Sequence, residues 1–291
     1  MGQNLEKKII IFGKGPAAKV ALKSAKKLLN KSWTVYYFYF KNENDQYDNL
    51  KICKNLKIKY ELISSYNCFS EKIFFIKPNF ILLIQCSLII KSDIISFMGE
   101  NIINLHHGNL PKYRGMAPIT NAILNREKSF GITLHFIEER IDAGKIIDQI
   151  IFNIEGLNNE EVYKKCIASD EEAISNLLKK INLSQKLDKI NQNEVEATYY
   201  PKTAINYESP IIDFNQISYS VISFCKAYYF PSKNLFPLIN FNNNLYYSTK
   251  EPKLGFKAIK PNIFKFNKEE RKLSISCKDR WILFENIKLK N

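Results

Sequence analysis

The sequence has few of the residues that build metal centres and disulfide frameworks. Its 291 residues include 6 cysteines and 3 histidines. The cysteines form no C-x-x-C pair, and none of them has a metal-type spacing with the histidines. We therefore expect reduced, mostly buried thiols, no metal ion and a cytoplasmic protein.

Long apolar runs are also missing. The most apolar stretch, residues 73–90, is interrupted by Lys77 and Gln85 among others, so it is too polar to span a membrane. Residues 1–12 carry no cleavable signal pattern. The chain shows no internal repeat and no low-complexity tract. These absences predict a globular protein with no membrane partner.

Acidic residues are too few to balance the basic ones. Lys and Arg number 43 against 29 Asp and Glu, which gives a formal net charge of +14. Such a charge suits an anionic partner, for example nucleic acid or a nucleotide-linked substrate. Lys, Asn and Ile are abundant from end to end, however, so a general residue bias explains the charge about as well.

Short apolar runs alternate with segments long enough to hold crossover helices. Five such runs occupy residues 9–12, 33–40, 58–63, 80–84 and 102–105. This alternation predicts an α/β domain with a mainly parallel sheet that is covered on both faces. Two more strands are expected on either side of an Asp-Ala-Gly loop, and helical periodicity follows them.

The carboxy-terminal part has a different pattern. Around residues 191–210 the periodicity is lost, which we interpret as a linker. One helical stretch and then short alternating stretches follow, broken by Pro, Gly and Asn-rich turns. We predict two domains, residues 1–204 and residues 205–291, of which the second is a small β-barrel.

Asn104 and His106 stand at the end of a predicted strand, where open α/β sheets bind their ligands. Residues two apart in a strand share a face, so these two polar groups converge while His107 points elsewhere. An amide beside an imidazole can stabilise an oxyanion and move protons near neutral pH. Asp142 would raise the pKa of His106 and fix its tautomer. The alternative is a structural histidine and an ordinary turn.

The segments around these residues resemble the folate-dependent formyltransferases. The matching segments are Asn104-Leu105-His106, Leu110-Pro111-Lys112-Tyr113-Arg114-Gly115, Ala117-Pro118, Gly131-Ile132-Thr133-Leu134-His135 and Asp142-Ala143-Gly144. The resemblance is strong over residues 101–152 and weaker on both sides. It implies a Rossmann-like catalytic domain, an OB-like barrel after it, 10-formyltetrahydrofolate as the donor, and Asn104, His106 and Asp142 as the catalytic residues.

The chain departs from the family pattern directly after the catalytic histidine. The family commonly has Ser shortly after this residue, and here His107, Gly108 and Asn109 follow it. Contacts with substrate near Asn109 are therefore not predicted.

The resemblance also implies where the donor and the acceptor lie. The residues expected to hold the pterin, partly through backbone groups, are Leu88, Ile89, Ile90, Glu138, Glu139, Arg140 and Ile141. A core role for Ile89 or Ile90 is an equal alternative, because backbone bonds do not fix side-chain identity. The candidates for holding a sugar nucleotide by stacking and charge are Tyr113, Arg114, Tyr199, Tyr200 and Lys202. Each of these can equally be a loop or core residue.

The expected reaction begins with attack of a neutral amine on the formyl carbon. Asn104 and protonated His106 then stabilise the oxyanion, and His106 relays a proton to the departing folate nitrogen. In this scheme Asp142 raises the basicity of His106.

The acceptor amine is the open question, since the family includes enzymes for amino sugars, initiator tRNA and a purine precursor. His135 and the Asp142-Ala143-Gly144 form favour a nucleotide-linked amino sugar, a precursor of cell-surface glycans, although His135 can also be a satisfied structural residue. The barrel disfavours the purine-pathway enzyme. Residues 206–291 hold fourteen Lys or Arg and seven Asp or Glu, which would suit tRNA phosphates.

Short connections after the first strands leave little room for the basic loop with which tRNA enzymes grip the acceptor stem. We therefore expect an amino-sugar enzyme and keep methionyl-tRNA formyltransferase as the alternative. A formyltetrahydrofolate hydrolase is less favoured, and a homodimer stays open.

Overall fold

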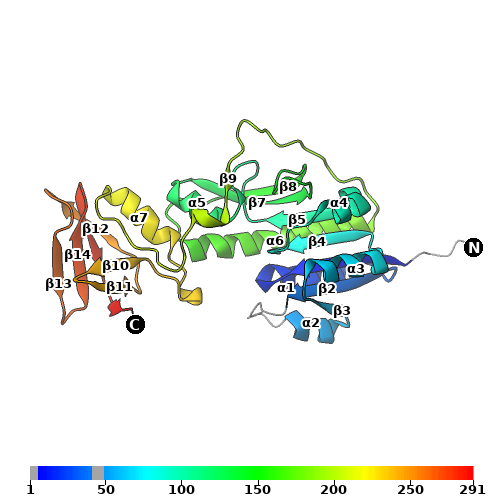
Figure 1. Cartoon of the computed structure of the whole chain (residues 1–291), viewed down its shortest axis with the longest axis horizontal. Helices are drawn as coiled ribbons and strands as arrows, with labels where there is room; N and C mark the ends of the chain where they lie inside the picture. Colours follow the sequence, from blue (N-terminus) through cyan, green and yellow to red (C-terminus); the bar gives the residue numbers. More distant parts are fainter. Residues whose placement is uncertain (1–5, 41–48, 291) are drawn as a thin grey trace, which may run out of the picture. The chain divides into compact units, whose positions relative to one another are not determined.

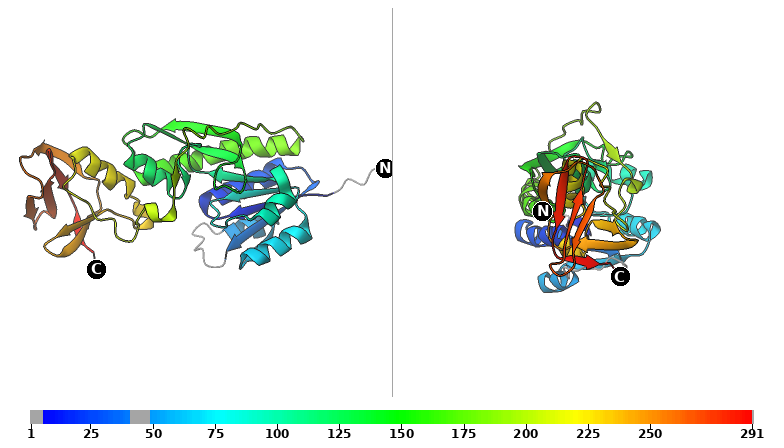
Figure 2. Two further views of the ribbon diagram at one scale, coloured as in Figure 1. Left: turned by 45° about the horizontal axis from the view of Figure 1, so that its top comes forward. Right: turned by 90° about the vertical axis from the view of Figure 1, so that its left-hand side faces the viewer.

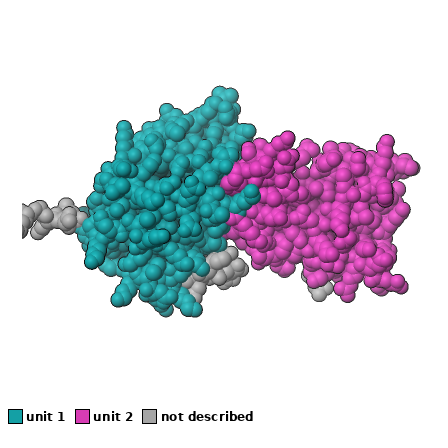
Figure 3. Space-filling view, turned by 180° about the vertical axis from the view of Figure 1, so that it is seen from behind, with its two compact units in different colours: residues 1–115, 131–151, 165–199 teal, residues 116–130, 152–164, 200–291 magenta. Residues whose placement is uncertain are grey.

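The computed structural model describes residues 6–40 and 49–290. The chain divides into two compact units (Figure 3). Unit 1 comprises residues 1–115, 131–151 and 165–199, and unit 2 comprises residues 116–130, 152–164 and 200–291. The predicted domain boundary between residues 204 and 205 stays a prediction.

A seven-stranded sheet forms the centre of the α/β part (Figure 1). Its order is β3-β2-β1-β4-β5-β7-β8. The strands are β1 (Lys7–Gly13), β2 (Trp33–Phe40), β3 (Lys59–Ile63), β4 (Phe80–Ile84), β5 (Ile102–His106), β7 (Ser129–Phe136) and β8 (Ile146–Asn153). The first five are parallel to their neighbours, whereas β7 runs antiparallel to β5. The predicted α/β domain is confirmed, with a sheet that is mixed and mostly parallel.

Helices cover this sheet on two faces (Figure 2). They are α1 (Gly15–Leu28), α2 (Asn49–Leu56), α3 (Tyr66–Ile76), α4 (Ser92–Met98) and α6 (Asn159–Asn182). Because strand order reverses between β1 and β4 while crossovers stay right-handed, α3 and α4 lie on the face opposite α1. Accordingly α3 and α4 share one core with Ile10 and Phe12 of β1 and with Ile81 and Leu83 of β4.

The middle of the sheet is packed too closely for a side chain at one position. A Cβ on Gly13, at the end of β1, would lie 1.9 Å from the carbonyl oxygen of Ile84 in β4. Only glycine allows this approach, and α1 begins two residues later at Gly15. The turn that joins β1 to α1 is therefore short, as the sequence predicts.

Unit 2 contains α5 (Pro118–Leu124), α7 (Ser218–Ala227) and an antiparallel β region. Three strands are ordered β10-β11-β16 and four are ordered β12-β15-β14-β13. They are β10 (Leu238–Phe241), β11 (Asn244–Ser248), β12 (Lys253–Lys257), β13 (Phe264–Asn267), β14 (Lys272–Ser276), β15 (Arg280–Phe284) and β16 (Ile287–Leu289). Both sheets share a core with Val221 and Cys225 of α7. A small β region after one helix is thus confirmed.

The described residues also form two-residue strands and short 3-10 helices. These are β6 (Arg114–Gly115), β9 (Tyr199–Tyr200), η1 (Gly99–Asn101), η2 (Lys202–Ala204) and η3 (Pro231–Lys233). Within residues 6–40 and 49–290, no helix combines the length and the apolar character needed to cross a membrane. Four of the six cysteines are buried, as expected: Cys53, Cys166, Cys225 and Cys277.

Candidate active site

Two neighbouring strands and the loop after them bring the predicted catalytic residues together. Asn104 and His106 lie on β5, and Asn104 is the antiparallel register partner of His135 on β7. Asp142 lies in the loop between β7 and β8. Because side chains alternate along a strand, His107 points away from Asn104 and His106. Its ring contacts Asp170 of α6, with 3.0 Å between Nε2 and Oδ1.

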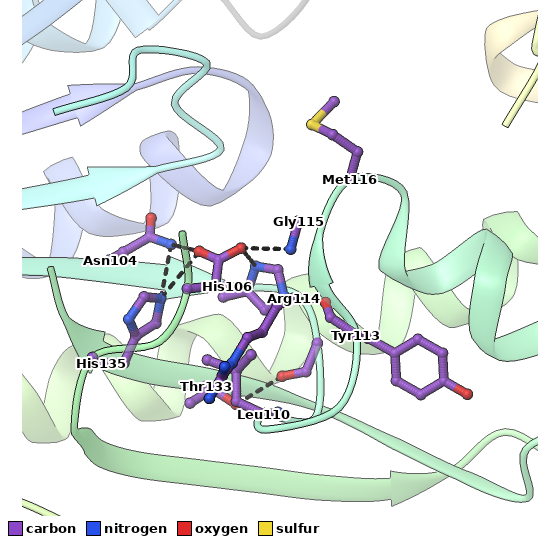
Figure 4. A network of polar contacts seen from close by, with 12 residues as sticks. Asn104, His106, Leu110, Tyr113, Arg114, Gly115, Met116, Thr133 and His135 are labelled. Atoms are coloured by element: carbon purple, nitrogen blue, oxygen red, sulfur yellow. Dashed lines mark hydrogen bonds and ion pairs between the residues drawn. The ribbon is translucent and has the colours of Figure 1, made fainter. Parts of the chain in front are cut away.

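The side chains of Asn104, His106 and His135 point toward one another in Figure 4. The carboxylate of Asp142 joins all three. Its Oδ2 is 3.6 Å from Nδ1 of His106, and its Oδ1 is 3.5 Å from Nε2 of His135 and 3.5 Å from Nδ2 of Asn104. The backbone N–H of Gly115 donates to Oδ2 over 2.8 Å. The structure therefore brings together the three residues that the sequence singles out.

The surroundings of Asp142 keep its carboxyl group ionised. Burial by itself raises the pKa of Asp142, but the charge of His106, the contact with His135 and the Gly115 N–H together outweigh burial. The net pKa therefore lies well below the usual range for aspartate. This permanent negative charge stabilises the imidazolium form of His106, which arises when the ring takes up a proton.

His106 is nearly buried, with 8% of its side chain exposed. Burial lowers the pKa of His106, and this outweighs the opposing effects of Asp142 and of the bond from Nε2 to the Tyr113 carbonyl, which is 2.8 Å long. Asp142 raises the pKa of His106, as expected, yet the net pKa of His106 lies below the usual histidine value. At neutral pH the resting ring is neutral, so the protonated His106 of the expected scheme must arise during the reaction.

Hydrogen bonding assigns distinct roles to Asn104 and His135. The Phe136 carbonyl accepts from Nδ1 of His135 over 2.8 Å, so in the tautomer with its proton on Nδ1 the Nε2 is an acceptor. The amide of Asn104 donates to this Nε2 over 3.1 Å and to Asp142 over 3.5 Å. The second bond is at the limit of hydrogen-bond length, so that hydrogen is the easier one to redirect to a substrate.

The loop after β5 is fixed by polar contacts from the strands beside it. Thr133 donates to the Gly108 carbonyl over 2.7 Å, and Gln149 donates to the Leu110 carbonyl over 2.6 Å. A Cβ on Gly108 would lie 2.4 Å from Nε2 of His106. Glycine at this position thus leaves room for the ring of His106.

The residues expected to hold the pterin differ in exposure. Ile90 belongs to the core beside α3 and α4, and Leu88 packs against it, whereas Ile89 is 68% exposed. The loop residues Glu138, Glu139, Arg140 and Ile141 are all exposed. Their contacts with folate stay predictions.

Two of the residues expected to hold a sugar nucleotide are buried. Tyr113 is 4% exposed, and Arg114 is 6% exposed. Tyr199 and Lys202 are exposed, and Tyr200 is partly buried. The contacts of these residues with substrate stay predictions.

The segment interpreted as a linker contributes groups that the sequence analysis missed. Gln192 and Glu194 hold the guanidinium of Arg114, and Gln192 also reaches the loop that carries Asp142. Because this segment has no hydrophobic periodicity, its sequence gives no sign of these contacts. No cluster of His, Cys, Asp or Glu suited to a metal ion occurs in the part of the chain that the structure describes.

Comparison with known proteins relates this geometry to one family. The family model for formyl transferase matches residues 43–178, which include Asn104, His106, His135 and Asp142. The chain is similar to formyl transferases over these residues, which make up slightly less than half of its length. A methionyl-tRNA formyltransferase from Syntrophomonas wolfei is 29% identical over 146 residues, which is 50% of this chain and 46% of that protein. The chain thus matches less than half of that relative's length.

Solved structures of formyltransferases share the fold over nearly the whole chain. The N-formyltransferase from Helicobacter canadensis, in complex with folinic acid and dTDP-3-aminofucose, matches with a TM-score of 0.78 and 24% identity, covering 97% of this chain and all of that chain. The sugar 3N-formyl transferase WlaRD, solved with dTDP and 5-N-formyl-THF, matches with a TM-score of 0.76 and 23% identity over 96% of this chain and 98% of its own.

Proposed function

We propose that the protein transfers the formyl group of 10-formyltetrahydrofolate to the amine of a nucleotide-linked amino sugar. The observation that carries this proposal is the convergence of Asn104, His106 and Asp142 at the end of β5, inside the region matched by the formyl transferase family. The ligands of the two structural relatives support the choice of donor and acceptor: folinic acid and dTDP-3-aminofucose in one, and 5-N-formyl-THF and dTDP in the other.

The chemistry starts with a neutral amine, since only its lone pair can attack the formyl carbon. As the C–N bond forms, the carbonyl oxygen gains negative charge, and the amide of Asn104 donates to it in place of Asp142. Neutral His106 takes the proton that the attacking nitrogen releases. The tetrahedral carbon then expels the folate nitrogen, to which His106 returns that proton, so the ring ends the cycle neutral.

Both ring nitrogens of His106 face acceptors, and this geometry suits the transient cation. Nδ1 lies 3.6 Å from the ionised carboxylate of Asp142, and Nε2 lies 2.8 Å from the Tyr113 carbonyl. A neutral ring has only one proton to offer these two acceptors, whereas the imidazolium satisfies both. Asp142 therefore contributes most when His106 carries the proton, which is the stage at which stabilisation lowers the barrier.

Full-length structural similarity favours the sugar over the tRNA substrate. Both sugar enzymes cover 96% or more of this chain, whereas the tRNA enzyme covers 50%. Methionyl-tRNA formyltransferase stays the second candidate because residues 206–291 are strongly basic. We place the pterin beside Leu88, Ile89, Ile90 and residues 138–141, of which Ile89 and the loop are open to solvent.

We further propose that residues 205–291 form the OB-like barrel of these enzymes and that the protein works in the cytoplasm. Two antiparallel sheets around one core support the barrel.

A formyl-transfer assay separates the two candidates. Purified protein is incubated with 10-formyltetrahydrofolate and either a panel of dTDP- and UDP-linked amino sugars or charged initiator methionyl-tRNA. We expect formylation of at least one sugar nucleotide and none by the His106→Asn variant. Activity on the tRNA alone would reject the sugar proposal, and release of formate without any acceptor would indicate a hydrolase.

A further inference from the structure

Gln192 makes an unusual set of contacts for a residue in an irregular segment. Its amide nitrogen donates to the Asp142 carbonyl over 2.8 Å and to the Gly144 carbonyl over 2.7 Å. Its amide oxygen accepts from Arg114 twice, from Nε over 3.0 Å and from Nη2 over 2.8 Å. The side chain of Gln192 thus uses both donors and both acceptor lone pairs of its amide, and it links Arg114 to the loop that carries Asp142.

The segment around Gln192 is itself anchored in unit 1 at both ends. Before it, Ile190 exchanges two backbone bonds with Ile146 of β8, of 2.8 and 2.9 Å. After it, the Thr198 hydroxyl accepts from the Tyr113 N–H over 2.8 Å. The side chain of Gln192 therefore reaches the site from a fixed backbone.

We propose that Gln192 is a positioning residue, which holds the turn at Asp142 so that its carboxylate faces Asn104 and His106. The proposal rests on the proposed function, in which that carboxylate stabilises the protonated ring.

The turn at Asp142 needs such support. Asp142 has a φ of 52°, in the left-handed region that non-glycine residues rarely adopt. Inside the turn the Ala143 N–H donates to the Arg140 carbonyl over 3.3 Å, which is a long bond. Gln192 donates two shorter bonds to the carbonyls of Asp142 and Gly144, on either side of Ala143. These bonds fix the backbone orientation of the turn, and with it the position of the Asp142 carboxylate.

Arg114 supplies the other half of the arrangement. Its guanidinium is almost buried and is bound by Gln192 and by both oxygens of Glu194. These contacts from Arg114 and Arg140 lower the pKa of Glu194 to about 2. Gln192 is thus clamped between a fixed cation and the turn, which restricts its amide to one orientation: oxygen toward Arg114 and nitrogen toward the two carbonyls.

Two variants separate the two sides of this amide. Gln192→Glu keeps an oxygen for Arg114 but removes both donors to the turn, and Gln192→Met removes all four bonds without adding charge. Gln185→Met is the matched control, because Gln185 is an exposed residue of the same connection. We expect kcat to fall about 10- to 100-fold in both Gln192 variants, with little change in KM for the sugar, and to stay unchanged in the control.

A titration of the His106 ring tests the proposal without any substrate. The chain has only 3 histidines, so their ring signals can be followed individually by NMR, and His106→Asn assigns the signal of interest. The groups that act on this ring are Asp142, His135, His107 and the Tyr113 carbonyl. Because Asp142 raises the pKa of His106, a displaced carboxylate moves the midpoint to lower pH, as Asp142→Asn does directly.

The expected result is a midpoint in Gln192→Met that lies below that of the wild type and toward that of Asp142→Asn, with Gln185→Met unchanged. A midpoint at or above the wild-type value in a folded Gln192→Met protein would overturn the proposal, as would full turnover by Gln192→Glu. If the wild type formylates no sugar, the proposed function fails, and the ring titration still decides the role of Gln192.

Discussion

Replacing Asp142 by Asn tests the electrostatic basis of the site. The substitution keeps the size of the side chain and an oxygen for the Gly115 N–H, and it removes the charge beside His106. At the observed 3.6 Å between Nδ1 and Oδ2, an effective dielectric constant near 20 gives an attraction of about 5 kcal/mol for the imidazolium. Without this attraction the pKa of His106 loses the upward contribution of Asp142, and we expect turnover to fall about 10²- to 10⁴-fold.

The assay follows tetrahydrofolate release between pH 5 and pH 9 at saturating donor and sugar. In the wild type the rate rises as His106 loses its proton, at a pH below the ordinary histidine value because burial lowers its pKa. In Asp142→Asn this limb moves further toward acid while the plateau drops. A plateau of Asp142→Asn within about threefold of the wild-type rate would refute the reasoning. The control is Asp188→Asn, a change at an exposed aspartate, which should leave the rate unchanged.

Three further predictions concern the same site. Asn104→Ala should lower kcat about 10²- to 10³-fold with donor binding retained, as measured by fluorescence titration with folate, because it removes an oxyanion donor. Gly144→Ala places a Cβ 1.9 Å from the Phe136 carbonyl oxygen, which accepts from His135. Thermal unfolding should show that the free energy of unfolding falls by about 1–3 kcal/mol, and the formyl-transfer assay should show that most of the activity is lost. The pKa of His106 is lower in the folded than in the unfolded chain, so as the pH falls the unfolded chain binds the proton first. His106 therefore lowers the free energy of unfolding as the pH falls below about 6.5. His106→Asn should abolish this part of the decrease of Tm at acidic pH.

Apolar patterning was sufficient to predict most of the fold. The runs at residues 33–40 and 80–84 coincide with β2 and β4, because strands buried on both faces require unbroken apolar sequence. The same pattern gives no strand direction, and β7 is antiparallel to β5. Whether the two antiparallel sheets of unit 2 close into a barrel is likewise a matter of long-range pairing that alternation does not encode.

Local spacing and the matching motifs were sufficient to predict the polar residues of the site. Alternation along one strand brings Asn104 and His106 to the same face, and the Asp-Ala-Gly motif identifies Asp142, because both are short-range features of the chain. His135 appears in the matching segments too, but its bond with Asn104 depends on the register of two strands. Gln192 carries no such signal, since it lies in an irregular segment.

The sequence by itself therefore determined the α/β class, the position of the site on the chain and the types of group that can act there. These follow from periodicity and from residue chemistry, which are local. Only the tertiary structure decided the balance of forces at His106, because desolvation depends on everything that packs around the ring. It also decided that Asn104, His106, His135 and the Gly115 N–H surround one carboxylate, because this depends on strand pairing and loop placement. Residue 192 reaches the same turn from an irregular segment.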